Sequence, residues 1–218
     1  MPPPRTANEA GSSKEAIIDA AERLFGRHGL DGVSLRQIVA ESGSLNNFAV
    51  QYHFGGKEGL IRAIFESRLE GMELKRARLL SNAKKEGREG NIYSLIEITF
   101  RPIAEYRNGV GDLSYAAFLL ALHHAHSSFQ SRAEVTELAP ITEHAMDLLA
   151  AALPHVPQDI FKTRIIGLTT CFLVSILQRD SCASLPEDIA IEDALAVVAA
   201  GVAAPAPERV RRAAAQKP

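Results

Sequence analysis

Side chains that can recognise the edges of nucleic-acid bases are gathered in one short segment of the chain. Asn47 and Gln51 each carry an amide with one donor and one acceptor side, which can read the edge of adenine or accept from cytosine in the major groove of DNA, and Asn46 beside them is a further candidate DNA contact. Phe48 lies among them and could contact a thymine methyl group, or it could equally pack against the preceding helix. These residue types indicate a surface that reads base edges by hydrogen bonds and apolar contact.

A second group with possible chemistry is the histidine run His123, His124 and His126. His123 and His126 are spaced so that they share one face of a helix, as metal ligands require. No cysteine or second histidine motif lies near them, so we expect polar histidines at a helix end and no metal site. A helical metalloprotein built on His123 and His126 is the alternative. The two cysteines, Cys171 and Cys182, form no C-x-x-C pair and are expected to be reduced thiols.

Two short helices joined by a tight turn are expected to position the base-reading side chains. Ser34 and Gln37 have the spacing of a capping box that opens the first helix, and Gly43 follows its end. Asn46 is a suitable N-cap for a second helix that runs through Tyr52. The pattern over residues 34–52 is therefore that of a helix-turn-helix, whose second helix enters the major groove.

The helical period divides the second helix into two sides. At about 100° per residue, Val50 and Phe54 point to one side, while Phe48, Gln51 and Tyr52 point away from it. We expect the first side to be buried and the second to face outward.

Residues 13–65 resemble the N-terminal domain of the TetR family of repressors. The resemblance is carried by Ala20-Ala21 and Leu24-Phe25 in the first helix, Ser34 at the start of the second, and Tyr52-His53-Phe54, Lys57-Glu58 and Leu60. It implies a DNA-binding domain followed by a helical domain that binds a ligand and forms a dimer.

The resemblance also implies roles for single residues. Ser34, Tyr52, His53 and Lys57 would bind phosphates of the DNA backbone, with a backbone carbonyl as the alternative partner of His53. The turn before the recognition helix is one residue longer than the family pattern. We expect Leu45 to take the buried position of the family's valine there.

Helical periodicity dominates the whole chain, and we predict an all-α protein of about nine helices. We expect a disordered leader over 1–12, the helix-turn-helix domain over 13–56, the ligand-binding and dimerisation domain over 57–204, and a flexible tail over 205–218. Helices are predicted near 13–28, 57–84, 91–107, 111–127, 132–153, 157–179 and 187–204.

The later helices supply candidates for a ligand pocket and a subunit interface. Large side chains that could line a pocket, or simply form the core, are Phe100, Tyr106, Tyr115, Phe118, Leu122 and Met146. Residues of the last two helices that could form a four-helix dimer contact, or pack within one subunit, are Ile165, Leu168, Phe172, Ile176, Ala194 and Val198. Few charges fall among the pocket candidates, which favours an apolar or aromatic effector.

The charge of the chain excludes a strongly basic nucleic-acid binder. Its net charge is −2, with 24 Lys and Arg against 26 Asp and Glu. Any contact with DNA must therefore come from a local surface. The first residues contain no apolar signal segment, and the apolar run 165–177 is shorter than a bilayer span, so we expect a cytoplasmic protein without a membrane partner.

The sequence contains no nucleophile–base motif, phosphate loop or nucleotide fingerprint, so we expect neither an enzyme nor a cofactor. The expected partners are a double-stranded DNA operator, a second copy of the chain and an unknown small-molecule effector that releases a repressor. The alternative is a DNA-binding or scaffold protein that responds to no ligand.

Overall fold

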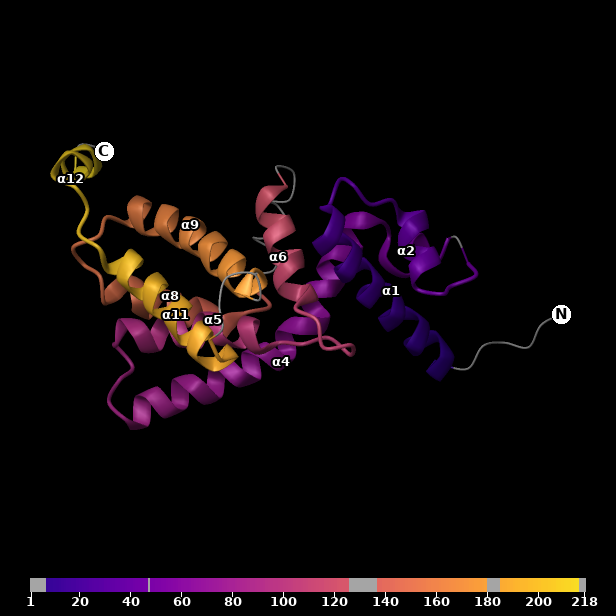
Figure 1. The fold of residues 1–218 in the computed structure, drawn as a ribbon, viewed down its shortest axis with the longest axis horizontal. Helices are drawn as coiled ribbons and strands as arrows, with labels where there is room; N and C mark the ends of the chain where they lie inside the picture. The colour runs from indigo at the N-terminus through magenta and orange to yellow at the C-terminus, as the bar shows by residue number, and fades with distance from the viewer. Residues whose placement is uncertain (1–6, 47, 126–136, 180–184, 216–218) are drawn as a thin grey trace. The chain divides into compact units, whose positions relative to one another are not determined.

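A computed structural model describes the backbone of residues 7–46, 48–125, 137–179 and 185–215. These residues form ten helices and no strand, which confirms the all-α prediction (Figure 1). The helices are α1 Ala7–His28, α2 Leu35–Glu41, α3 Ala49–Phe54, α4 Lys57–Lys85, α5 Ile92–Glu105, α6 Ser114–His124, α8 Pro140–Ala151, α9 Gln158–Leu177, α11 Glu187–Ala203 and α12 Glu208–Ala215.

The chain forms two compact units whose segments alternate along the sequence. The N-terminal unit consists of Met1–Glu70 and Tyr106–Leu138, and the C-terminal unit consists of Gly71–Glu105 and Ala139–Pro218. These units do not coincide with a division at residue 56, because α6 packs along α1. The functional division into 13–56 and 57–204 stays a prediction.

Aromatic rings form the centre of the N-terminal unit. The ring of Phe65, on α4, lies 5.5 Å from that of Phe118, on α6, and Phe118 lies 6.3 Å from Phe25, on α1. Gly26 allows α1 and α6 to approach closely, since a Cβ atom there would lie 2.9 Å from the Cβ atom of Ala117. The packing of α1 on α6 therefore depends on a missing side chain.

The C-terminal unit packs α5, α8, α9 and α11 around an aliphatic and aromatic core. The rings of Phe100 on α5 and Phe172 on α9 lie 5.1 Å apart, and both residues are buried. Gly201, on α11, lets α9 approach, because a Cβ atom there would lie 2.8 Å from the side chain of Leu168. The two helices are thus held at close range inside the unit.

The start of α8 is stabilised by a side chain of another helix. Its N-cap residue, Ala139, offers no side-chain hydrogen bond. Glu73 of α4 supplies the missing acceptors: one carboxylate oxygen accepts the N–H of Ile141 at 2.6 Å, and the other accepts the hydroxyl of Thr142 at 2.7 Å. N–H groups in a first helical turn lack partners within the helix, so Glu73 fixes where α8 begins.

Some helix limits differ from the sequence prediction. α1 begins at Ala7, inside the expected leader, and α12 lies inside the expected flexible tail. α12 is rich in Ala, Glu and Arg, which are strong helix formers, and the extension of α1 contains Ala7, Glu9 and Ala10. α8 begins at Pro140, and proline fits the first position of a helix; the predicted start near 132 lies outside the described residues.

Candidate nucleic-acid interface

The capping box at the start of α2 has the predicted geometry. The hydroxyl oxygen of Ser34 accepts the N–H of Gln37 at 3.3 Å, and the side-chain oxygen of Gln37 accepts the N–H of Ser34 at 2.8 Å. Buried Ile38 and Val39 hold α2 against the unit. Ser34 is exposed at this helix end, where a phosphate could reach its hydroxyl.

The recognition helix begins later than the sequence prediction. α3 starts at Ala49 with Phe48 at the N-cap, so the prediction of Asn46 as N-cap is wrong. The side-chain oxygen of Asn46 instead accepts the N–H of Phe48 at 3.0 Å and closes a local turn. This turn competes with helix formation at the same residues, which explains the shift. Asn47, a predicted base-reading residue, lies outside the described residues.

Phe48, Gln51 and Tyr52 face outward as predicted, but Ala49, expected beside them, is buried with Val50, and Phe54 is half-buried. Of the two alternatives for Phe48, packing against a helix of this chain is excluded, because its ring is exposed and does not pack into the unit. The amide nitrogen of Gln51 donates to the carbonyl of Gly55 at 3.2 Å.

Leu45 does not take the buried position expected for it. Its side chain is 93% exposed, so it lies on the surface of the turn between α2 and α3. The longer turn explains the difference, because the extra residue lets the chain pass outside the core before Ala49 and Val50 enter it.

Tyr52 and His53 lie side by side in the last turn of α3. Their rings lie 5.0 Å apart in an edge-to-face arrangement, and the helix ends after Phe54 at Gly55, whose φ is 71°. Tyr52 is exposed and His53 half-buried. Phosphate binding by these two residues, and by Ser34, stays a prediction.

Lys57 has internal partners at the start of α4. Its ammonium group donates to the carbonyl oxygens of Leu30 and Val33, the latter at 3.3 Å, and it lies 5.6 Å from the centre of the Phe25 ring. These contacts fasten the loop before α2 to α4. The predicted role of Lys57 as a phosphate ligand would require it to leave them.

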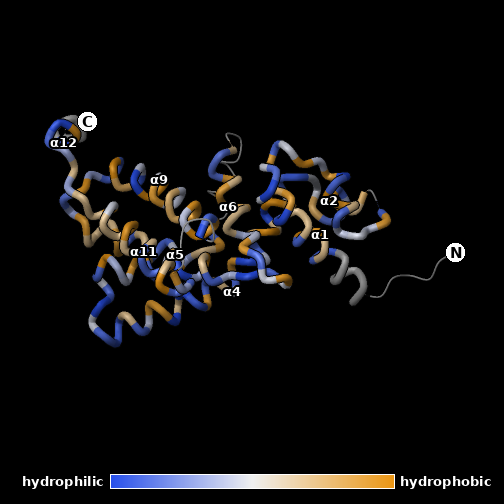
Figure 2. Tube along the Cα trace, in the orientation of Figure 1, coloured by the Kyte–Doolittle hydropathy of each residue, from blue (hydrophilic) through white to orange (hydrophobic). Residues whose placement is uncertain are grey.

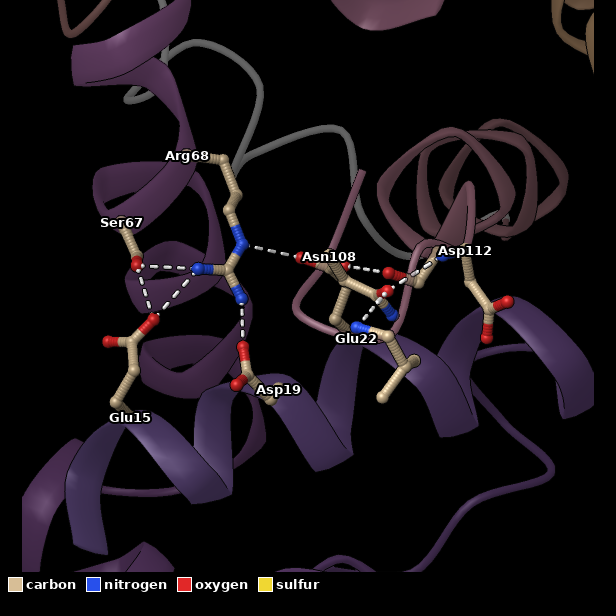
Figure 3. A network of polar contacts seen from close by, with 9 residues as sticks. Glu15, Asp19, Glu22, Ser67, Arg68, Asn108 and Asp112 are labelled. Atoms are coloured by element: carbon tan, nitrogen blue, oxygen red, sulfur yellow. Dashed lines mark hydrogen bonds and ion pairs between the residues drawn. The ribbon is translucent and has the colours of Figure 1, made fainter. Parts of the chain in front are cut away.

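A buried arginine joins α4 to α1 within the N-terminal unit (Figure 3). Arg68 donates to Glu22 at 2.7 Å, to Glu15 at 2.8 Å and to Asp19. Glu22, which is 1% exposed, also accepts the hydroxyl of Ser114 at the start of α6. Burial by itself would lower the pKa of Arg68, but the hydrogen bond and charge of Glu22 outweigh it and raise that pKa. The sequence analysis did not detect this network, although acids at 15, 19 and 22 share a helix face.

The six pocket candidates do not gather in one compact unit. Phe100 and Met146 belong to the C-terminal unit, and the other four belong to the N-terminal unit. Within the N-terminal unit, Tyr115, Phe118 and Leu122 are buried core residues, and Tyr106 stacks edge-on against Tyr115 at 5.8 Å. The ligand pocket therefore stays a prediction.

Most of the interface candidates lie inside the C-terminal unit. Phe172, Ile176, Ala194 and Val198 are buried, and Ile165 and Leu168 are half-buried. A residue covered within its own subunit cannot form most of a subunit contact, so the choice of residues needs correction. These side chains occupy the sides of α9 and α11 that pack on each other and on α5.

Other residues of the same helices are exposed. We call them the outer face of α9 and α11: Ile166, Gly167, Cys171, Ile189, Ala196, Val197 and Ala200. Apolar residues recur along both helices in Figure 2. The sequence period placed the apolar residues on these helices, but could not distinguish the side that faces the core from the side that faces outward.

α9 is also long and apolar enough to cross a membrane by length and composition. The sequence prediction considered only the apolar run 165–177, which is shorter than a bilayer span. The helix that contains this run begins earlier, at Gln158, and is therefore longer than the run. In the described residues of the unit, α9 packs on α11, and its Arg164 donates to the carbonyl of Val202 at 2.9 Å.

The metal alternative gains no support from the part of the chain that the structure describes. No group of three or more metal-binding side chains occurs among those residues. His123 lies in the last turn of α6, and His126 falls outside the described residues.

Comparison with known proteins identifies the N-terminal region. Residues 17–64 match the model for bacterial regulatory proteins of the tetR family. SrpR of Pseudomonas putida, an HTH-type transcriptional regulator, is 37% identical over 70 residues, which is 32% of this chain and 32% of SrpR. LmrA of Bacillus subtilis, also an HTH-type transcriptional regulator, is 48% identical over 58 residues, 26% of this chain and 30% of LmrA. The chain thus spans about a third of the length of these relatives.

Solved structures share the fold over most of the chain. The transcriptional regulator FadR from Bacillus subtilis, in complex with stearoyl-CoA, has a TM-score of 0.53 at 16% identity, covering 86% of this chain and 98% of that one. A mutant of HlyIIR has a TM-score of 0.55 at 15% identity, covering 93% and 100%. At such identities the likeness concerns the fold. The match at residues 17–64 shows that this N-terminal region is similar to the tetR family of bacterial regulatory proteins.

Proposed function

We propose that the protein is a homodimeric regulator that binds a two-fold symmetric DNA operator through residues 34–57. The observation that carries this proposal is the division of α3, whose Ala49 and Val50 are buried while Phe48, Gln51 and Tyr52 face outward. A helix this short, with one side fixed to its domain and the other exposed, can enter the major groove.

The dimer contact is assigned to the outer face of α9 and α11. Its members Ile166 and Val197 are 45% and 55% exposed, although they are large and apolar. Gly167, Ala196 and Ala200 are small enough to let a second pair of helices approach closely. A contact of this face with itself is isologous, as a two-fold dimer requires.

We further propose that a small molecule bound in the helical domain after residue 57 releases the repressor from its operator. An effector can act only if it prefers the state that does not bind DNA. The apolar core around Phe100 and half-buried Met146 favours an apolar or aromatic molecule. Operator binding that no small molecule changes would favour the scaffold alternative.

The test of DNA binding is a selection of bound sequences from a random duplex pool at near-physiological salt, with a known regulator as control. An enriched palindrome, whose half-sites are about one DNA turn apart, is the expected result. Failure to enrich any sequence, under conditions where the control succeeds, would contradict the proposed function. It would favour the alternatives of a helical metalloprotein or a scaffold protein.

We place the protein in the cytoplasm, with α9 in a subunit contact and not in a membrane. The measurement is extraction of the full chain from cells with alkaline carbonate, which removes proteins that do not span a bilayer. Retention of the chain in the membrane pellet would contradict this assignment.

A further inference from the structure

The most exposed large apolar side chains of the described residues lie around the recognition helix. Leu45 is 93% exposed, Tyr52 81% and Phe48 77%, and no other large apolar residue in that part of the chain exceeds them. We call these three residues the apolar strip. Exposed apolar residues scattered singly are ordinary, but these three lie close together in the sequence, on the turn before α3 and on α3 itself, which favours a surface that another molecule covers.

Local structure holds the apolar strip outward. The N–H of Phe48 is bound to the side chain of Asn46, and its carbonyl accepts the N–H of Tyr52 at 2.9 Å. Ala49 and Val50 already fill the adjoining core, so a rotation of α3 that buried Phe48 would expose them. The strip is therefore fixed in place before any partner binds.

The same segment has no arginine or lysine with which to read guanine. Residues 42–56 contain no Arg, Lys, Asp or Glu. The commonest specific contact in the major groove, arginine or lysine to guanine, is therefore not open to it. The segment instead offers amides, which can read adenine or accept from cytosine, and apolar surface, which matches the one apolar group on a base edge, the thymine methyl.

We propose that Leu45 and Phe48 read the C5-methyl groups of thymines, so that the base pairs met by α3 are A·T pairs recognised largely by their methyl groups. This proposal rests on the proposed function, because it concerns the same surface. Tyr52, the third member of the strip, is 81% exposed, and its hydroxyl is free to bind a phosphate or a base edge.

The experiment compares thymine with deoxyuridine in the operator obtained by selection. Deoxyuridine keeps the hydrogen-bonding groups of thymine and lacks only its methyl group. Each symmetric pair of thymines is replaced in turn, and the Kd of the full-length protein is measured. At a contacted pair we expect Kd to rise about fourfold per methyl, or about fifteenfold for the two half-sites.

Variants assign the effect to the strip. Phe48→Ala and Leu45→Ala should bind the thymine duplex more weakly than the wild-type chain, and each should lose its sensitivity to deoxyuridine at one pair. Gln51→Ala should weaken binding but keep that sensitivity. Val110→Ala removes another exposed apolar side chain, 73% exposed in the loop before α6, and should behave as wild type. Thermal melting of each variant checks its fold.

Three results would overturn the proposal while leaving DNA binding by the protein standing. The first is equal binding of thymine and deoxyuridine duplexes at every position. The second is that Phe48→Ala and Leu45→Ala keep the full methyl sensitivity of the wild-type chain. The third is that these variants lose self-association, which would make the strip a protein contact. Failure to select any operator would overturn both proposals.

Discussion

Arg68 is the residue on which the N-terminal unit depends most for its polar interior. It is 7% exposed and neutralises Glu22, which is 1% exposed. Removing one partner of a buried pair leaves the other charge without compensation, which typically costs about 3–5 kcal/mol. We expect Arg68→Met to lower the free energy of unfolding by that amount in a denaturant titration.

A control for this variant lies on the same helix. Arg62 forms an exposed pair with Glu66 at 2.9 Å, and such pairs contribute about 0.3–0.5 kcal/mol. Arg62→Met should therefore change the free energy of unfolding little. Equal effects of the two substitutions would show that the Arg68 network does not stabilise the unit.

Tyr106 should give the unit a dependence on alkaline pH. Burial raises the pKa of Tyr106 to about 12; Arg68 opposes the change, and the carboxylates of Glu22 and Asp19 add to it. The folded state thus favours the neutral phenol relative to the unfolded chain, whose tyrosine pKa is about 10. This contribution to stability is complete below pH 10 and is lost as the pH rises towards 12.

Tyr106→Phe removes the ionisable group and keeps the ring. Between pH 10 and 12, the free energy of unfolding should fall less steeply in this variant than in the wild-type chain. Parallel pH profiles for the two proteins would contradict the half-buried, neutral state of Tyr106.

Lys57 offers a choice between a structural and a DNA-binding role. Its contacts with the carbonyls of Leu30 and Val33 predict that Lys57→Met lowers the free energy of unfolding by about 1.5–3 kcal/mol, since hydrogen bonds from charged donors have that strength. If the ammonium stays there in the complex, the salt dependence of operator binding should be unchanged. A decrease of the salt slope by about one would assign Lys57 to a phosphate instead.

At the scale of the element, replacing two helical glycines by alanine should have opposite effects on stability. A Cβ atom at Gly26 would collide with Ala117 and with the backbone of Phe118, whereas one at Gly71 would meet no atom within 4 Å. Glycine inside a helix costs about 0.5–1 kcal/mol relative to alanine. Gly71→Ala should therefore raise the Tm.

Gly26→Ala should lower the Tm, because the gain in helix propensity is smaller than the cost of moving α6 away from α1. Differential scanning calorimetry of both variants measures the contrast. A rise in Tm for Gly26→Ala would mean that α1 and α6 are not in close contact in solution.

The sequence predicted the presence of the helices better than it predicted where they begin and which of their faces is buried. The capping box at Ser34 gave the start of α2, because its residues and spacing are specific. The start of α3 was misplaced, because Asn46 is as suitable for a local turn as for an N-cap. On α9, periodicity identified apolar positions but not which of them, Phe172 or Ile166, faces the core. The Arg68 network joins residues 15–22 to residue 68, and no local pattern reveals a contact over that separation.

At the scale of the whole molecule, the dimer proposal predicts a change in mass. Ile166→Asp combined with Val197→Asp places charges on the outer face of α9 and α11, where a dimer would bury them. We expect light scattering after size exclusion to show a dimer for the wild-type chain and a monomer for this variant. Leu74→Asp, at an apolar residue of α4 that is 59% exposed, serves as the matched control and should stay dimeric. A wild-type monomer at micromolar concentration would contradict the proposal.

The apolar strip also limits how much free protein a cell can hold. The net charge of −2 gives the molecules little mutual repulsion, and Leu45, Phe48 and Tyr52 are open to solvent whenever no DNA covers them. The solubility of the protein should then depend on the fraction of chains bound to DNA. Chains in excess of the operators are expected to precipitate or be degraded. A surface made to read methyl groups would in this way set a ceiling on the abundance of its own regulator.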